Sequence, residues 1–245
     1  MGRPHVIAVV TGASSRLGSA IARDLAARSY SIVAVGRDRH AATAALAAHG
    51  VPQPRIVSAD LTRPEGRETL DKAIAELPSV EVLVNAVGAF SGGSVSDVPP
   101  GRFDEIVQQN LCAPYAAIHA TIEPLKQSRG SIVNVASLLG LTTIPDTLAA
   151  AYMAAKAGVV QLSRGLAVEL APYRVRVNCV CPGILSPVTG YGDAMRIGTY
   201  TAARQIQRLS TIDETAAAVT FLATCESPWI TGAVMEADGG AMTSR

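Results

Sequence analysis

The stretch "VVTGASSRLGSAIA" (residues 9–22) joins a short apolar run to a helical pattern through a glycine-containing turn. Gly12 permits a tight turn and lets backbone N–H groups come close to a ligand. The helix expected over about residues 17–28 presents unpaired N–H groups and the positive end of its dipole, which together favour a phosphate. A nucleotide pyrophosphate is the ligand expected in this crevice of an open α/β sheet. The spacing is not G-x-G-x-x-G, so a plain β–α turn is the alternative.

The same alternation continues along the chain. Strand-like runs occupy residues 6–10, 31–35, 55–59, 81–85, 131–136, 175–180 and 233–237. Helices are expected over about 17–28, up to about 49, and over 65–76, 103–127 and 149–171. Continuous β-branched runs are typical of strands covered on both faces. The sequence therefore predicts a single α/β domain over residues 1–245, a Rossmann-type doubly wound parallel sheet of about seven strands with helices on both faces.

Composition excludes several classes of function. The 21 basic and 20 acidic residues give a formal net charge of +1, so no electrostatic feature favours nucleic acid or a membrane surface. No apolar run reaches the roughly 18 residues of a transmembrane helix. The four cysteines are scattered, and the Cys179-x-Cys181 pair lacks the further ligands of a zinc site. We expect reduced thiols, no bound metal and a cytoplasmic protein.

The second predicted strand ends in "AVGRDR" (34–39), where the cofactor preference of such a fold is decided. An acidic residue there would bind the adenosine ribose of NAD, whereas an arginine would accommodate a 2′-phosphate. Gly36 takes the acidic position, Arg37 follows it, and Asp38 is expected to cap the next helix. Together with Arg16, this arrangement favours NADP(H). The alternative is that Arg37 is a solvated loop charge.

The bland helical stretch "AAAYMAAKAG" (149–158) carries a phenol and an amine four residues apart. Tyr152 and Lys156 should therefore lie on one helix face. A nearby ammonium favours the phenolate, so we expect Lys156 to lower the pKa of Tyr152. Such a tyrosine could serve as general acid for a carbonyl that is being reduced. Taken alone, the spacing is also common on ordinary surface helices.

Taken together, these segments resemble the short-chain dehydrogenase/reductase family. The resemblance rests on Thr11-Gly12 and Gly18 of the turn, "SAD" (58–60), "VNAVG" (84–88), "IVNVAS" (132–137), the Y-x-x-x-K pair, "PG" (182–183) and "ITGAVMEADGG" (230–240). Arg16 stands where the family usually has a glycine, which resembles its pteridine-reductase branch. The cofactor-binding residues implied are Gly12, Ser14, Ser15, Arg16, Leu17, Gly18, Arg37, Asp60, Leu61, Asn85, Ala86, Gly88, Tyr152, Lys156, Pro182, Gly183 and Leu185.

The resemblance also implies four catalytic residues. Tyr152 would give a proton to the substrate oxygen, and Ser137 would position that oxygen. Lys156 would tune Tyr152 and bind the nicotinamide ribose, while Asn110 would hold a water that links the lysine to solvent. The alternatives are a loop-capping serine at 137 and, at 110, a helix-interior asparagine that bonds the backbone.

Two departures from the family pattern concern the substrate side. The segment between Ser137 and Tyr152 is two residues longer than usual, and "ILSP" (184–187) lacks the family's threonine. Residues 90–101 and about 184–205 are expected to set specificity, the second as a mobile lid.

The resemblance implies NADPH-dependent reduction of a small-molecule ketone or 3-oxo carbonyl by a homo-oligomer, a tetramer or a dimer. The alternatives are a 3-oxoacyl-carrier-protein reductase, a pteridine-type C=N reductase and a catalytically silent dinucleotide sensor.

Overall fold

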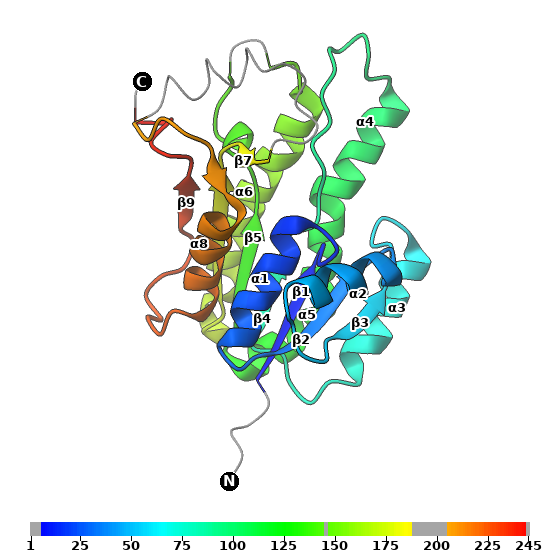
Figure 1. Cartoon of the computed structure of the whole chain (residues 1–245). Coiled ribbons are helices and arrows are strands. Elements are labelled where there is room, and N and C mark those ends of the chain that lie inside the picture. Colours follow the sequence, from blue (N-terminus) through cyan, green and yellow to red (C-terminus); the bar gives the residue numbers. More distant parts are fainter. Residues whose placement is uncertain (1–5, 145–146, 188–204, 244–245) are drawn as a thin grey trace.

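Seven parallel strands form the central sheet, in the order β3-β2-β1-β4-β5-β6-β9 (Figure 1). The structure is a computed structural model that describes residues 6–144, 147–187 and 205–243. The strands are β1 (Ile7–Thr11), β2 (Ser31–Gly36), β3 (Arg55–Ser58), β4 (Val82–Asn85), β5 (Ser131–Val135), β6 (Arg176–Pro182) and β9 (Val234–Ala237). The predicted fold class is confirmed.

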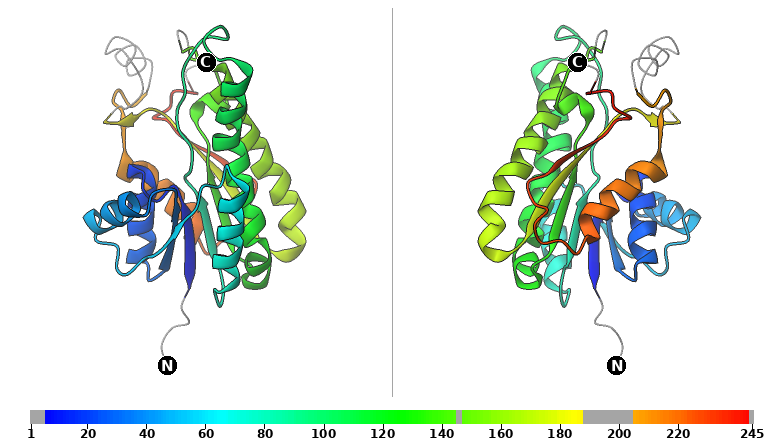
Figure 2. Two further views of the ribbon diagram at one scale, coloured as in Figure 1. Left: turned by 90° about the vertical axis from the view of Figure 1, so that its right-hand side faces the viewer. Right: turned by 90° about the vertical axis from the view of Figure 1, so that its left-hand side faces the viewer.

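Helices cover both faces of this sheet (Figure 2). One layer holds α1 (Arg16–Ala27), α2 (Arg39–Ala48) and α8 (Ile212–Thr224); the other holds α3 (Pro64–Ala75), α5 (Ala113–Ser128) and α6 (Ala150–Leu170). Successive strand residues point to opposite faces, so Val9 joins the core under α3, α5 and α6, whereas Val10 joins the core under α1 and α8. Double coverage explains why the strands read as continuous apolar runs.

The first turn is shaped by contacts at the carboxyl ends of the strands. Gly12 adopts φ +69°, and a Cβ there would lie 2.6 Å from the Ala86 carbonyl oxygen that follows β4. The Ser15 hydroxyl caps α1 by accepting from the Gly18 N–H at 3.0 Å. Asp38 caps α2 by accepting from the N–H groups of His40 and Ala41, which confirms the predicted cap. In the sheet, β2 and β3 lie on one side of β1 and β4 lies on the other. The turn after β1 therefore lies at the point where the strand order reverses.

Several elements differ from those predicted. The helix expected over 103–127 is divided into α4 (Pro100–Val107), a π-helical turn (Gln108–Cys112) and α5. An additional helix, α8, was not among the predicted elements; it is mostly apolar, and a capping box between Thr211 and Glu214 begins it. Two short strands, β7 (Leu185–Ser186) and β8 (Ser210–Thr211), pair outside the main sheet. In the described ranges, no helix has the length and apolar character needed to cross a bilayer.

Gly66 provides a test of how tightly α3 packs beside the carboxyl end of β3. A Cβ there would lie 2.1 Å from the Asp60 carbonyl oxygen, so Gly66→Ala should lower the free energy of unfolding by roughly 1–3 kcal/mol through overpacking. Gly165→Ala is the matched control, because Gly165 is an exposed helical glycine with nothing within 4 Å of an added Cβ. It should stabilise by about 0.5–1 kcal/mol. Equal denaturant midpoints for the two variants would contradict this packing.

Candidate functional site

A cavity of about 210 Å³ lies at the carboxyl ends of β1, β2, β3 and β4. It brings together eight of the predicted cofactor-binding residues: Gly12, Ser14, Ser15, Arg37, Asp60, Leu61, Ala86 and Gly88. Prediction missed other lining residues, among them Thr62 and Gln109. Thr62 could have been predicted, because it lies in the same loop after β3 as Asp60 and Leu61. Gln109 could not, because it belongs to the π-helical turn that was not predicted. The absence of a side chain at Gly12 and the positive end of the α1 dipole make this cradle suitable for a dinucleotide phosphate.

Asp60 and Arg37 are the charged groups of this cavity. Partial burial acts to raise the pKa of Asp60, but two hydrogen bonds from Thr62 and the charges of Arg37 and Arg63 lower that pKa overall. The carboxylate is therefore ionised at neutral pH and held in place by Thr62. Arg37 lies at the end of β2, where its guanidinium adds a positive charge to the cavity wall.

The remaining predicted residues of the first turn and of β4 have other contacts. Arg16 donates from its guanidinium to the Pro187 carbonyl at 2.9 Å, which joins the turn to the segment after β6. Leu17 packs against the core under α1, and Gly18 lies so close to the turn that its Cβ would be 2.2 Å from the Gly12 carbonyl oxygen. Asn85 is buried beneath the cavity, with its amide bonded inside the sheet.

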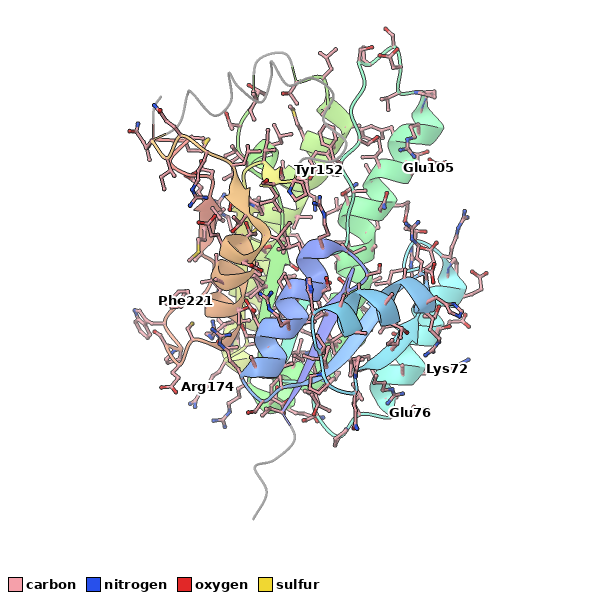
Figure 3. The ribbon with its side chains drawn as sticks, viewed as in Figure 1. Lys72, Glu76, Glu105, Tyr152, Arg174 and Phe221 are labelled. Atoms are coloured by element: carbon pink, nitrogen blue, oxygen red, sulfur yellow. The ribbon has the colours of Figure 1, made fainter. Side chains whose placement is uncertain are left out.

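Tyr152 and Lys156 share one face of α6, as predicted. Figure 3 shows Tyr152 at the end of the sheet toward which the strands point. The Lys156 ammonium lies 5.9 Å from the centre of the Tyr152 ring and donates to the Val135 carbonyl at 3.0 Å. Phe90 packs edge-on against the same ring, with the ring centres 5.3 Å apart. Both polar side chains are buried.

Burial controls the electrostatics of this pair. It raises the pKa of Tyr152 to about 12, although a hydrogen bond with Ser137 acts to lower it. Burial also lowers the pKa of Lys156 to about 8. The expectation that Lys156 lowers the pKa of Tyr152 is therefore wrong for this structure, because the loss of water around the phenol outweighs any gain from the amine. At neutral pH the phenol keeps its proton.

Ser137 and Asn110 complete the cluster. The Ser137 hydroxyl accepts from the Leu139 N–H at 3.2 Å, so it caps the turn after β5 while also bonding Tyr152. Asn110 sits in the π-helical turn, where its amide donates to the Ile106 carbonyl at 3.0 Å and accepts from the Ala89 N–H at 3.1 Å. Asn110 therefore makes the backbone hydrogen bonds that the alternative interpretation, a helix-interior asparagine, expects.

Gly88 brings Asn110 and Lys156 together. A Cβ at Gly88 would lie 2.7 Å from the Asn110 oxygen and 3.0 Å from the Lys156 amine. The lysine, the asparagine and the loop after β4 therefore meet at one point beside the cavity, and only a glycine leaves room for that contact.

The predicted residues after β6 lie on the other side of the site. Pro182 ends β6, Gly183 donates to the Ala237 carbonyl at 3.0 Å, and Leu185 belongs to β7. Gly183 also lines a second cavity of about 360 Å³. Of the expected lid over about 184–205, residues 188–204 lie outside the described residues.

The cysteines are free thiols, and Cys179 and Cys181 lie 4.0 Å apart inside the core. Among the residues that the structure describes, no group of three or more His, Cys, Asp or Glu side chains could hold a metal ion.

Comparison with known proteins agrees with this geometry. A family model described as Enoyl-(Acyl carrier protein) reductase matches residues 12–242. The chain is 35% identical over 246 residues to cis-4-hydroxycyclohexanecarboxylate dehydrogenase of Sinomonas cyclohexanicum, covering 96% of this chain and 95% of that protein. It is 32% identical over 241 residues to 3-oxoacyl-(acyl-carrier-protein) reductase FabG of Escherichia coli (strain K12), covering 96% of each.

A solved structure shows the same fold over nearly the whole chain. The crystal structure of an oxidoreductase of the short-chain dehydrogenase/reductase family from Burkholderia thailandensis superposes with a TM-score of 0.87 at 28% identity, covering 98% of this chain and 94% of that one. The family model, the relatives and the superposed fold lead to one conclusion: this chain belongs to the short-chain dehydrogenase/reductase family of oxidoreductases.

Proposed function

We propose that the protein reduces a ketone or 3-oxo carbonyl with NADPH, using Tyr152 as general acid. The observation that carries the proposal is the meeting of Ser137, Tyr152 and Lys156 beside a cavity that suits a dinucleotide. Two similar proteins are named for alcohol or 3-oxo chemistry, which supports the same reaction type. These side chains act on a carbonyl group, and they do not define the rest of the substrate.

The chain's own residues would position the carbonyl and supply the proton. Bound NADPH would supply the hydride. The Ser137 hydroxyl would hydrogen-bond the carbonyl oxygen and hold it against the phenol of Tyr152. As negative charge develops on that oxygen, the Tyr152 hydroxyl gives it a proton. An alkoxide is a stronger base than a phenolate, so a phenol with a raised pKa still donates, and at neutral pH it is always in the protonated form needed to do so.

Lys156 would stabilise the phenolate that remains after the proton has left. Its ammonium is already held by the Val135 carbonyl, so the charge is in place before the reaction begins. The route by which Tyr152 regains a proton would pass through Lys156 and Asn110, whose amide oxygen lies against the same glycine as the amine.

The charges at the end of β2 favour NADP(H) over NAD(H). The Asp38 carboxylate, the first acidic group along the chain after β2, caps its own helix, while Arg37 lines the cavity. A guanidinium binds a 2′-phosphate strongly, whereas nothing at Gly36 replaces the acidic partner of an NAD ribose. Arg16 would add a second guanidinium near the start of α1.

The surroundings of Tyr152 favour an apolar substrate. Tyr152 belongs to an apolar cluster with Leu139, against which Phe90, Ile144 and Met153 pack, so the substrate carbonyl would sit beside apolar walls. A 3-oxoacyl thioester or a simple ketone fits this description, and the pteridine-type alternative has no contact of its own in its favour beyond Arg16.

We further propose that the chain is one domain that works as a cytoplasmic homo-oligomer, a tetramer or a dimer. Exposed apolar side chains on the outer helices support the assembly, among them Tyr115 on α5 and Val168 on α6. The four free thiols are consistent with a reducing compartment.

Removal of the phenolic hydroxyl tests the general acid. Tyr152→Phe should lower kcat for carbonyl reduction by at least about 100-fold, because the proton donor is lost while the ring is kept. The Kd for NADPH, measured by fluorescence, should stay near the wild-type value. Equal rates for the two proteins across a ketone panel would rule the assignment out. Tight NADPH binding with no turnover by the wild type would instead favour the silent sensor.

Cofactor choice is tested at the end of β2. Arg37→Ala should weaken NADPH binding by about 10- to 100-fold, the range of a charge-assisted hydrogen bond worth roughly 1.5–3 kcal/mol, and leave NADH binding unchanged. Arg28→Ala is the control, since Arg28 lies at the far end of α1 and bonds the Asp24 carbonyl. Isothermal titration gives both affinities. An equal loss for NADPH and NADH would contradict a role at the 2′-phosphate.

Buried Lys156 predicts a specific pH dependence of stability. Its folded-state pKa of about 8 lies below the ordinary value of 10.5, so below pH 8 the folded protein carries a buried charge. Between pH 8 and 10.5 the unfolded chain binds the proton that the folded chain has released, so stability rises with pH.

Lys156→Met should therefore be more stable than the wild type at pH 7, by up to the order of 3 kcal/mol. This advantage should shrink between pH 8 and 10.5. Chemical denaturation of both proteins across this range measures it, and a difference that does not change with pH would argue against a depressed lysine.

A further inference from the structure

Four buried polar side chains cross the apolar sheet beneath the cavity; we call Thr11, Asn85, Asn134 and Ser163 the polar ladder. The Thr11 hydroxyl donates to the Asn85 oxygen at 3.1 Å, and the Asn85 amide donates to the Asn134 oxygen at 2.9 Å. The Asn134 amide in turn donates to the Ser163 hydroxyl at 2.9 Å. Strand register places Thr11 opposite Asn85 and Asn85 opposite Asn134, so the polar ladder runs straight across β1, β4 and β5 to α6.

The direction of donation along the polar ladder is fixed by its partners. Asn85 also donates to the Pro114 carbonyl at 3.3 Å, and Ser163 donates to the Val159 carbonyl at 2.7 Å. A carbonyl can only accept, so each amide can face only one way. Every member then has a partner, and bonds that point in one direction strengthen one another in a low-dielectric interior.

Each strand member of the polar ladder stands one residue before a part of the site. Thr11 precedes Gly12, and Asn85 precedes Ala86, whose carbonyl presses against Gly12. Asn134 precedes Val135, whose carbonyl accepts from Lys156. The polar ladder therefore joins the cofactor turn to the strand that holds the lysine.

Ser163 lies on the same face of α6 as the pair above it. It follows Lys156 by seven residues and Tyr152 by eleven, close to two and three full helical turns. Two neighbouring residues of β5 therefore hold α6 at two points on one face: Val135 holds Lys156, and Asn134 holds Ser163.

Apolar packing and hydrogen bonds act differently on the position of α6. The other buried contacts of this helix are apolar and come from Val159, Leu166, Leu170 and smaller residues such as Ala167. The hydrophobic driving force is non-directional, so it does not by itself select one orientation of a polar group on the helix. Hydrogen bonds are directional and lose strength within a few tenths of an ångström.

We propose that Asn134 and Ser163 are positioning residues, which set the rotation and height of α6 and so hold Lys156 and Tyr152 against the cofactor turn. This inference rests on the proposed function for its effect on catalysis. Neither residue touches the reacting groups; each acts through the helix. A misplacement of about 1 Å at a catalytic group can cost on the order of 100-fold in rate.

Three variants separate positioning from ordinary stability. Ser163→Ala removes the last member of the polar ladder, and Ser163→Thr keeps the hydroxyl. Thr220→Val is the matched control, because Thr220 is a buried hydroxyl on α8 that donates to the Ala216 carbonyl at 2.8 Å, the same bond to its own helix.

Ser163→Ala should lower kcat by about tenfold or more with KM and the NADPH Kd changed less than threefold. Ser163→Thr should restore most of kcat. Thr220→Val should lower the unfolding midpoint about as much as Ser163→Ala does, yet keep the wild-type kcat.

A second readout does not need turnover. The chain has only three lysines, Lys72, Lys126 and Lys156, so ε-¹³C-labelled protein gives three resolved signals, and loss of one in Lys156→Met assigns it. The titratable groups that face Lys156 are Tyr152, Cys179 and Cys181; every variant retains them, and Ser163→Thr also keeps the hydroxyl that bonds Cys179. Lys156 should titrate near pH 8 in the wild type and in Thr220→Val, and nearer to 10.5 in Ser163→Ala, where a loosened helix admits water.

The outcomes distinguish this inference from the proposed function. A folded Ser163→Ala protein with wild-type kcat and an unmoved Lys156 titration would overturn the inference, even if Tyr152→Phe is inactive. If the wild type reduces no carbonyl, the proposed function fails and the lysine titration alone decides the inference. Should Ser163→Ala not fold, Ser163→Cys replaces it in both measurements, and the same two outcomes decide.

Discussion

The hydrogen bond from the buried Lys156 ammonium to the Val135 carbonyl is the contact on which the rest of the site depends. A lone ammonium inside a protein is costly, so it persists only where oriented carbonyls receive it. The carbonyl belongs to β5, an interior strand that pairs with β4, and the carboxyl ends of β1, β2, β3 and β4 open toward the cavity. The same sheet therefore positions the cofactor turn, the lysine and, through α6, the phenol.

Burial also gives the site its chemical character. Exclusion of water raises the pKa of Tyr152 and lowers the pKa of Lys156, so the two groups are drawn toward their neutral forms. A neutral phenol is a proton donor, while an amine with a pKa of about 8 remains mostly charged at pH 7 and can stabilise the phenolate that forms. The pair thus suits the proposed reaction, in which negative charge develops on a carbonyl oxygen.

Much of this arrangement could be predicted from local sequence. Continuous apolar runs indicated a doubly covered parallel sheet, Gly12 and Asp38 indicated the turn and the cap, and the spacing of Tyr152 and Lys156 indicated a shared face. These features depend on residues close in the chain.

The features that could not be predicted depend on partners far apart in the sequence. The Asn110 side-chain oxygen in the π-helical turn accepts from the Ala89 N–H, and the bond between Asn134 and Ser163 joins a strand to a distant turn of α6. The balance between burial and charge at Tyr152 also follows only from the packed structure. Asn134 did carry one signal, since a polar residue inside "SIVNV" must find a buried partner.

The protonation state of Tyr152 tests the central claim most directly. Ultraviolet difference titration of the wild type against Tyr152→Phe isolates the absorbance of this one phenol among the six tyrosines. The account predicts no tyrosinate signal from Tyr152 at neutral pH and its appearance only well above the ordinary value of 10, because burial raises its pKa to about 12. A tyrosinate band at pH 7 would contradict the account.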